Sequence, residues 1–209
     1  EPRRLPGLWL YGGMLLPHFG HLLSECVHRL WAWREHGDCQ GVIFVAPPKF
    51  QAEAMPAFVH AILAYFGIPA DKVRLVFTNT VVDRLVVPEQ CSGLGMPAAG
   101  DYSDFLARLQ AAHASTLAAP DKLFVSRRGY LEKGRVVGMD YLAKALEERG
   151  YTEFAPQEHP FEHQLHCIGA AEKIIFEEGS AIHLLDALPR IKAEVFIIKR
   201  RPKYKLFDE

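Results

Sequence analysis

Three short stretches of the sequence carry residue types that could bind an anion or move a proton. The first, Lys173–Leu188, has the pattern of a buried strand, Ile174–Phe176, that turns sharply into a helix. At the start of that helix, the backbone N–H groups from Gly179 to Ile182 would be left unpaired. Such an end attracts anions, above all phosphate. An ordinary turn in which Ser180 only caps the helix is the alternative.

The second stretch is an arginine pair, Arg127 and Arg128, which follows the predicted strand Lys122–Ser126. Two guanidinium forks could hold a diphosphate through paired hydrogen bonds, whereas exposed arginines in a solvated loop are the alternative. If the second half of the chain forms a parallel sheet, Arg127 and the Gly179–Ser180 turn lie at the same sheet edge. Two anion-binding features would then converge there.

The third stretch brings together two imidazoles and a carboxylate, His18, His21 and Glu25. Histidine suits proton transfer at neutral pH, and a carboxylate one helical turn away can orient it. The alternative is a histidine that caps a helix or packs in a core. We therefore hold His21 as the candidate base, with Glu25 as its helper and His18 as its competitor.

No metal site is expected from the sequence. Four cysteines are scattered without a CxxC pair, which fits neither a zinc site nor a disulfide scaffold and agrees with a reducing compartment. Three further histidines share one predicted helical segment without the carboxylate or cysteine neighbours of a convincing zinc site: His159, His163 and His166.

Composition excludes several classes of partner. The chain has 209 residues, is 49% hydrophobic and carries a net charge of −1, so it has no broad basic surface for nucleic acid or an acidic membrane. No apolar run approaches the roughly 20 residues of a membrane span, and no signal peptide is visible. The chain opens at Glu1 without a methionine, so the alternative that a targeting or other N-terminal segment has been removed is left open.

Strand and helix patterns alternate along the chain, which predicts an α/β fold with parallel sheets and right-handed crossovers. Predicted strands are 7–16, 41–46, 73–77, 81–87, 122–126, 151–154, 174–176 and 194–198, and predicted helices are 21–35, 52–66, 104–117, 138–149, 161–171 and 181–188. The rhythm is interrupted by a stretch rich in Gly, Pro and Ser. We therefore predict a Rossmann-like domain at 1–100, a linker and connecting helix at 101–120, and a second Rossmann-like domain at 121–209, with the ligand in a cleft between them.

Four segments taken together, HFGHLLSECVHRLW, VPEQ, LFVSRRG and PQEHPFEHQLHCIGAAEKIIFEEGSAIH, resemble glycosyltransferase family 61 (DUF563-type) proteins, in particular bacterial members of capsular or surface polysaccharide synthesis. The resemblance spans nearly the whole chain. It implies a GT-B enzyme that inverts the anomeric carbon, with the nucleotide-sugar donor on the second domain and the acceptor on the first. The matching positions are His21, Arg127, Gln164, Glu178, Gly179, Ser180 and His183.

The chain departs from that family at two acidic positions, where Met139 and Gln157 stand in place of glutamate. Asp140 or Glu158 could substitute through a one-residue shift. We expect a metal-independent glycosyltransferase that needs no cofactor besides a UDP- or GDP-linked donor, acts on a glycan acceptor, and works in the cytoplasm or at the inner face of the membrane. A non-catalytic nucleotide- or glycan-binding protein is the alternative. A phosphotransferase is disfavoured, because a P-loop and paired metal-binding aspartates are missing.

Overall fold

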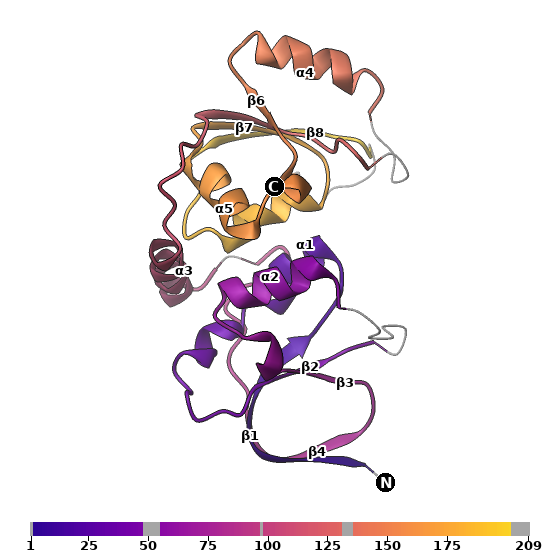
Figure 1. Ribbon diagram of the computed structural model, residues 1–209, viewed down its shortest axis with the longest axis vertical. Helices are drawn as coiled ribbons and strands as arrows, with labels where there is room; N and C mark the ends of the chain where they lie inside the picture. Colours follow the sequence, from indigo (N-terminus) through magenta and orange to yellow (C-terminus); the bar gives the residue numbers. More distant parts are fainter. Residues whose placement is uncertain (1, 48–54, 97, 131–135, 202–209) are drawn as a thin grey trace. The chain divides into compact units, whose positions relative to one another are not determined.

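The computed structural model of the protein describes residues 2–47, 55–96, 98–130 and 136–201. The chain divides into two compact units, Glu1–Ala111 (unit 1) and Ala112–Glu209 (unit 2), so the boundary lies inside the stretch 101–120. Each unit holds a four-stranded sheet in which neighbouring strands are parallel (Figure 1). The predicted α/β class with two parallel sheets is confirmed.

The sheet of unit 1 has the order β3-β2-β1-β4. Its most buried strand, β2, is apolar throughout, as expected for a strand covered on both faces. The ladder between β1 and β4 shifts register between Leu5 and Leu8, and the ladder between β1 and β2 shifts between Tyr11 and Gly13. A glycine with positive φ lies at each shift, Gly7 at 87° and Gly13 at 94°. The strands are β1 (Arg3–Met14), β2 (Val42–Val45), β3 (Val73–Val76) and β4 (Thr80–Val86).

The segment predicted as one α-helix, 21–35, is instead broken into three short pieces. They are α1 (Phe19–His21), the π-helical η1 (Leu22–Cys26) and the 3₁₀ turn η2 (Leu30–Trp33). Tertiary hydrogen bonds account for the difference: the indole of Trp31 donates to the Glu89 carbonyl at 3.1 Å and that of Trp33 to the Gly67 carbonyl at 2.8 Å. These bonds tie the segment to distant loops that a straight α-helix would not meet together.

Two regular α-helices complete unit 1, and a short 3₁₀ turn, η3 (Ala70–Lys72), connects the first of them to β3. The first, α2 (Ala57–Tyr65), begins after Pro56, and the predicted residues 52–54 lie outside the described part of the chain. The second, α3 (Gly100–Ala112), packs its aromatic face into the unit 1 core. Within that core the Tyr102 hydroxyl and His28 Nδ1 are 3.0 Å apart, and both side chains are buried. The predicted helix 104–117 is therefore shifted toward the N-terminus.

Unit 2 has the strand order β6-β5-β7-β8, with all neighbouring strands parallel. The chain adds β6 on one side of β5 and then β7 and β8 on the other side, so the strand order reverses between β5 and β7. Figure 1 shows α4 on one face of this sheet and α5 on the other. An open parallel sheet wound in this way collects ligands at the carboxyl ends of the strands on either side of the reversal. The elements are β5 (Lys122–Val125), α4 (Met139–Glu147), β6 (Thr152–Phe154), η5 (Pro156–Glu158), α5 (Phe161–Ala170), β7 (Lys173–Glu177), η6 (Ser180–Ala187) and β8 (Glu194–Ile198).

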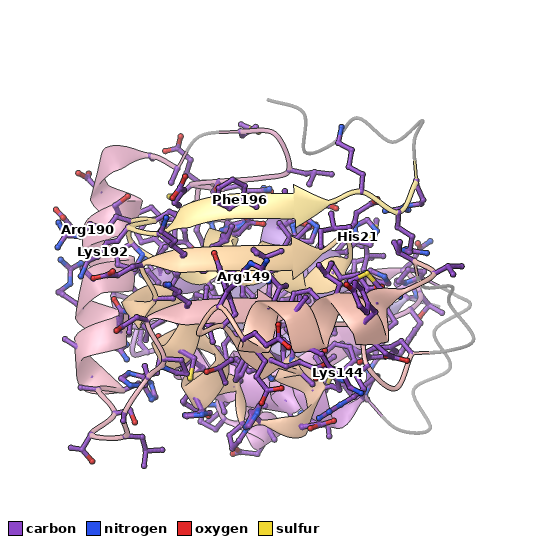
Figure 2. The ribbon with its side chains drawn as sticks, turned by 90° about the horizontal axis from the view of Figure 1, so that it is seen from above. His21, Lys144, Arg149, Arg190, Lys192 and Phe196 are labelled. Carbon is purple, nitrogen blue, oxygen red and sulfur yellow. The ribbon has the colours of Figure 1, made fainter. Side chains whose placement is uncertain are left out.

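Packing on the α4 face depends on a few apolar side chains. Met139 and Leu146 of α4 bury against Phe124 of β5, which explains why an apolar residue stands at position 139. Viewed from above (Figure 2), Lys144 of α4 and Phe196 of the edge strand β8 lie on this same side of unit 2, and Phe196 is 47% exposed. On the opposite face, the segment after β7 is the 3₁₀ helix η6 and not the predicted α-helix.

Candidate functional site

Arg127 and Gly179 meet at the carboxyl edge of the unit 2 sheet, at the reversal between β5 and β7. The guanidinium of Arg127 lies directly over the Gly179 backbone, so that a Cβ atom on residue 179 would collide with Nη1. Gly179 has φ 176°, an extended conformation open to any residue. Glycine is therefore needed here for the close approach of Arg127 and not for backbone strain.

A buried carboxylate, that of Glu177, binds the backbone of Arg127. Glu177 is 1% exposed, and its Oε2 accepts the Arg127 backbone N–H at 2.9 Å. Its other oxygen, Oε1, is buried and has no hydrogen-bond partner in the described part of the chain. Burial lowers the pKa of Arg127, repulsion from Arg200 lowers it further, and Glu177 opposes both effects. The guanidinium is thus a partly desolvated cation with another cation near it, an arrangement that an anion would stabilise.

Glu178 organises the turn that follows β8. Its Oε2 accepts the backbone N–H groups of Arg200 at 2.7 Å and Arg201 at 2.9 Å, and its Oε1 accepts the Arg201 side chain at 2.6 Å. Burial by itself raises the pKa of Glu178, but these hydrogen bonds outweigh it and hold the pKa below its usual range. The sequence placed Glu178 in the donor site; the structure shows its carboxylate binding the chain at 200–201.

Sequence reasoning missed Glu177, Arg200 and Arg201. A signal for the two arginines was present, because the basic run Lys199–Arg201 follows the predicted strand 194–198 directly, and parallel strands end at a common edge. No sequence signal distinguished Glu177 from its neighbour Glu178.

Arg128 diverges from Arg127. Its guanidinium is 57% exposed and pairs with Glu153 at 3.4 Å and Glu158 at 3.5 Å, near the end of β6. Gln157 reinforces this arrangement, since its side-chain amide donates to the Arg128 carbonyl at 2.7 Å. The two guanidinium groups expected to hold a diphosphate together thus have different partners in the fold.

The remaining predicted donor-site residues lie on η6 and α5. The sequence predicts an unpaired N–H group at Ile182. In the structure this N–H donates to the Gly179 carbonyl at 3.2 Å, so it is not free to bind an anion. His183 Nδ1 lies 2.9 Å from Asp186 Oδ2. Gln164 of α5 is buried, donates its amide to the His159 carbonyl at 2.8 Å and keeps its Oε1 without a partner among the described residues.

In unit 1, His21 and Glu25 form a close pair just after β1. His21 Nδ1 and Glu25 Oε1 are 2.5 Å apart, and the two side chains are 47% and 37% exposed. Glu25 lies in the π-helical turn η1, an irregularity that often marks functional sites. His18 has the capping role raised as an alternative, because its Nδ1 accepts the His21 backbone N–H at 3.5 Å.

Across residues 2–47, 55–96, 98–130 and 136–201, no three His, Cys, Asp or Glu side chains are grouped closely enough to hold a metal ion. Within those ranges no helix combines the length and apolarity that a bilayer-spanning segment needs.

Comparison with known families decides the relationship of the chain. The family model described as Glycosyltransferase 61 matches residues 19–191. The chain belongs to the glycosyltransferase 61 family. Within this glycosyltransferase 61 chain, the match includes His21, Arg127 and Gly179 and ends before β8 and Arg200.

Other comparisons of the glycosyltransferase 61 chain are weaker. No curated protein sequence matches it. Among solved structures, it is similar to the bacterial iron-containing dodecameric glycosyltransferase TibC from enterotoxigenic E. coli H10407, with 11% sequence identity and a TM-score of 0.40. The alignment covers 94% of this chain and 59% of that one.

Proposed function

We propose that the protein transfers a sugar from a nucleotide-sugar donor, UDP- or GDP-linked, to a hydroxyl group of a glycan or polysaccharide acceptor. The observation that carries the proposal is the meeting of Arg127 with Gly179 at the β5–β7 reversal of unit 2. A partly desolvated guanidinium over a bare glycine backbone, at the edge where α/β sheets bind ligands, is suited to a phosphate group. Membership of the glycosyltransferase 61 family supports the reaction class.

In this proposal the arginines stabilise the leaving group. As the bond between the anomeric carbon and the diphosphate oxygen breaks, negative charge grows on the diphosphate. Arg127 and Arg200 supply fixed positive charge for it, since donors preorganised toward developing charge provide a large part of catalysis. Three roles are proposed on this side: Arg127 and Arg200 bind the diphosphate, Glu177 positions Arg127, and Glu178 holds the turn at 200–201. The reaction would then proceed without a metal.

The proposed base is His21 of unit 1. The acceptor hydroxyl attacks the anomeric carbon, its proton passes to the His21 imidazole, and the nucleoside diphosphate departs from the opposite face, which inverts the anomeric carbon. The 2.5 Å contact between His21 Nδ1 and Glu25 supports this role, because a carboxylate on one ring nitrogen fixes the ring and leaves Nε2 to accept a proton. This division of labour, with the acceptor and base on unit 1 and the donor on unit 2, is that of a GT-B enzyme built from two Rossmann-like domains.

Three further residues are proposed donor contacts with narrower support. Gln164 has a buried oxygen without a partner in the described ranges, which could accept a hydrogen bond from the nucleoside. Ser180 and His183 belong to the η6 segment that begins at the Gly179 turn. Arg128, held by Glu153 and Glu158, is proposed to border the site and not to bind the diphosphate. Surface polysaccharide synthesis at the cytoplasmic side remains part of the proposal.

Two measurements test the function. The first is calorimetric titration with UDP, GDP and the matching monophosphates, for which we expect one diphosphate to bind and its monophosphate to bind more weakly. The second follows donor hydrolysis and transfer with and without EDTA, where an unchanged rate is expected. If neither UDP nor GDP binds, the proposal is contradicted. Binding without hydrolysis or transfer would instead support the non-catalytic nucleotide-binding alternative.

A further inference from the structure

Unit 1 contains an arginine, Arg29, that forms no ion pair with a carboxylate in the described part of the chain. Its guanidinium Nη1 donates to Gln90 Oε1, a neutral acceptor, and the guanidinium carbon lies 5.9 Å from the centre of the Tyr11 ring. No described Asp or Glu forms an ion pair with it. Its Nε is buried and has no partner within the described ranges. A donor removed from water without a partner has a cost that calls for an explanation.

The position of Arg29 in the fold offers one. Its Nη1 would lie 3.8 Å from a Cβ atom placed on Gly13, so the guanidinium reaches the carboxyl end of β1. Gln90 follows β4, the neighbour of β1 on the other side, and the strand order of this sheet reverses between β1 and β4. Arg29 therefore occupies in unit 1 the kind of place that Arg127 occupies in unit 2, at the strand reversal where parallel sheets bind ligands.

The Arg29–Gln90 contact is held from both sides. On one side the Cys91 backbone N–H donates to the His28 carbonyl at 3.2 Å, and on the other the Trp31 indole donates to the Glu89 carbonyl at 3.1 Å. Residues within two positions of Arg29 are thus bonded to the two residues that flank Gln90. Both side chains remain partly exposed, so a ligand can approach a guanidinium whose position is already fixed.

We propose that Arg29, with Gln90 and the Gly13 turn, forms a subsite for an anionic group on a sugar, either a carboxylate or a phosphate. A guanidinium without an ion-pair partner among the described residues is suited to such a group, and binding would place a counter-charge in direct contact with it. The assignment of this group to the acceptor rests on the proposed function. The anion subsite itself does not, because it is defined by unit 1 alone.

The test uses ¹⁵N-labelled protein titrated at constant ionic strength with three sugars, glucuronate, glucose 6-phosphate and neutral glucose. We expect at least one anionic sugar to shift the amide resonances of Gly13 and Gln90 in the wild type, and glucose to leave them unchanged. Arg29→Gln should weaken that binding by about tenfold or more. Arg29→Lys, which keeps the charge but loses the planar fork, should be intermediate. The matched control is Arg4→Gln, an exposed arginine near the other end of β1, which should behave as the wild type.

Each outcome decides the matter. Shifts caused by glucuronate alone assign a carboxylate, and shifts caused by glucose 6-phosphate alone assign a phosphate. Equal shifts in Arg29→Gln, equal shifts with glucose, or no shift with either anion would overturn the proposal. If Arg29→Gln does not fold, Arg29→Lys carries the same test. UDP and GDP binding is measured on the same samples. If the wild type binds neither nucleotide, the proposed donor site is contradicted, but the result at Arg29 is not affected.

Discussion

Gly179→Ala is the substitution that tests the donor site most directly. A methyl group at residue 179 must displace the Arg127 guanidinium, which lies in the space that the Cβ atom would occupy. Because Gly179 is extended at φ 176° and the displaced group is the end of a side chain, the backbone is not strained and the protein should still fold. The substitution therefore moves one cation and leaves its charge in the protein.

The expected loss follows from the bonds that Arg127 would make. Hydrogen bonds to a charged group contribute about 1.5–3 kcal/mol, which corresponds to roughly 10- to 150-fold weaker binding of a nucleoside diphosphate. Arg127→Ala should cause a similar loss. The double variant should lose little more than either single one, because both changes remove the same contact.

Isothermal titration calorimetry with UDP and GDP measures these affinities. The matched control is Gly37→Ala, since a Cβ atom at that glycine would meet nothing within 4 Å and its φ is not in the left-handed region. The reasoning is refuted if Gly179→Ala binds the diphosphate as tightly as the wild type. Losses in Gly179→Ala and Arg127→Ala that simply add would also refute it, since the two residues would then act separately.

Three further predictions follow from the base and from two titrating groups. His21→Ala should lower the transfer rate about 10²–10⁴-fold while the affinity for the donor hardly changes, and His18→Ala should be milder; near-normal turnover in a folded His21→Ala protein would exclude His21 as the base. Because the pKa of Glu178 is depressed in the folded state, its stabilising effect is present above the ordinary carboxyl value of 4.5 and is lost as pH falls through the folded pKa. Glu178→Gln should therefore reduce the acid sensitivity of thermal unfolding, whereas Glu194→Gln, at an exposed ion pair, should not. Burial and the neighbouring His159 and His166 lower the pKa of His163 in the folded protein. The unfolded state therefore binds more protons below pH 6.5, and stability should fall as pH drops from there. His163→Gln should flatten this part of the plot of melting temperature against pH, and an unchanged plot would show that His163 is not the group responsible.

The convergence of Arg127 and Gly179 could be predicted because it depends only on strand direction. An apolar strand followed by a charged or glycine-rich turn, repeated along the chain, indicates parallel strands, and parallel strands end at one edge. The strand β8, Glu194–Ile198, has the bounds that the sequence predicts, and two arginines, Arg200 and Arg201, come soon after it. The same argument from strand direction would have added Arg200 and Arg201 to the site.

The long-range hydrogen bonds could not be predicted from the sequence. Trp31 and Trp33 donate to carbonyls 58 and 34 residues away, and these bonds help to break what looked like one continuous helix from 21 to 35. His28 and Tyr102 meet across 74 residues in the unit 1 core. Helical spacing of apolar residues describes only local periodicity, so it could not anticipate partners supplied by other loops.

The sequence by itself determined which residue types reach the edges of the two sheets, because alternation of strand and helix fixes strand direction. Only the tertiary structure decided what each side chain does there. Glu177 and Glu178 are adjacent and chemically identical, yet one supports Arg127 and the other binds the chain at 200–201. Successive strand residues point to opposite sides, and the last residues of a strand meet whatever loop the neighbouring strand supplies. Their roles therefore depend on packing that no local pattern contains.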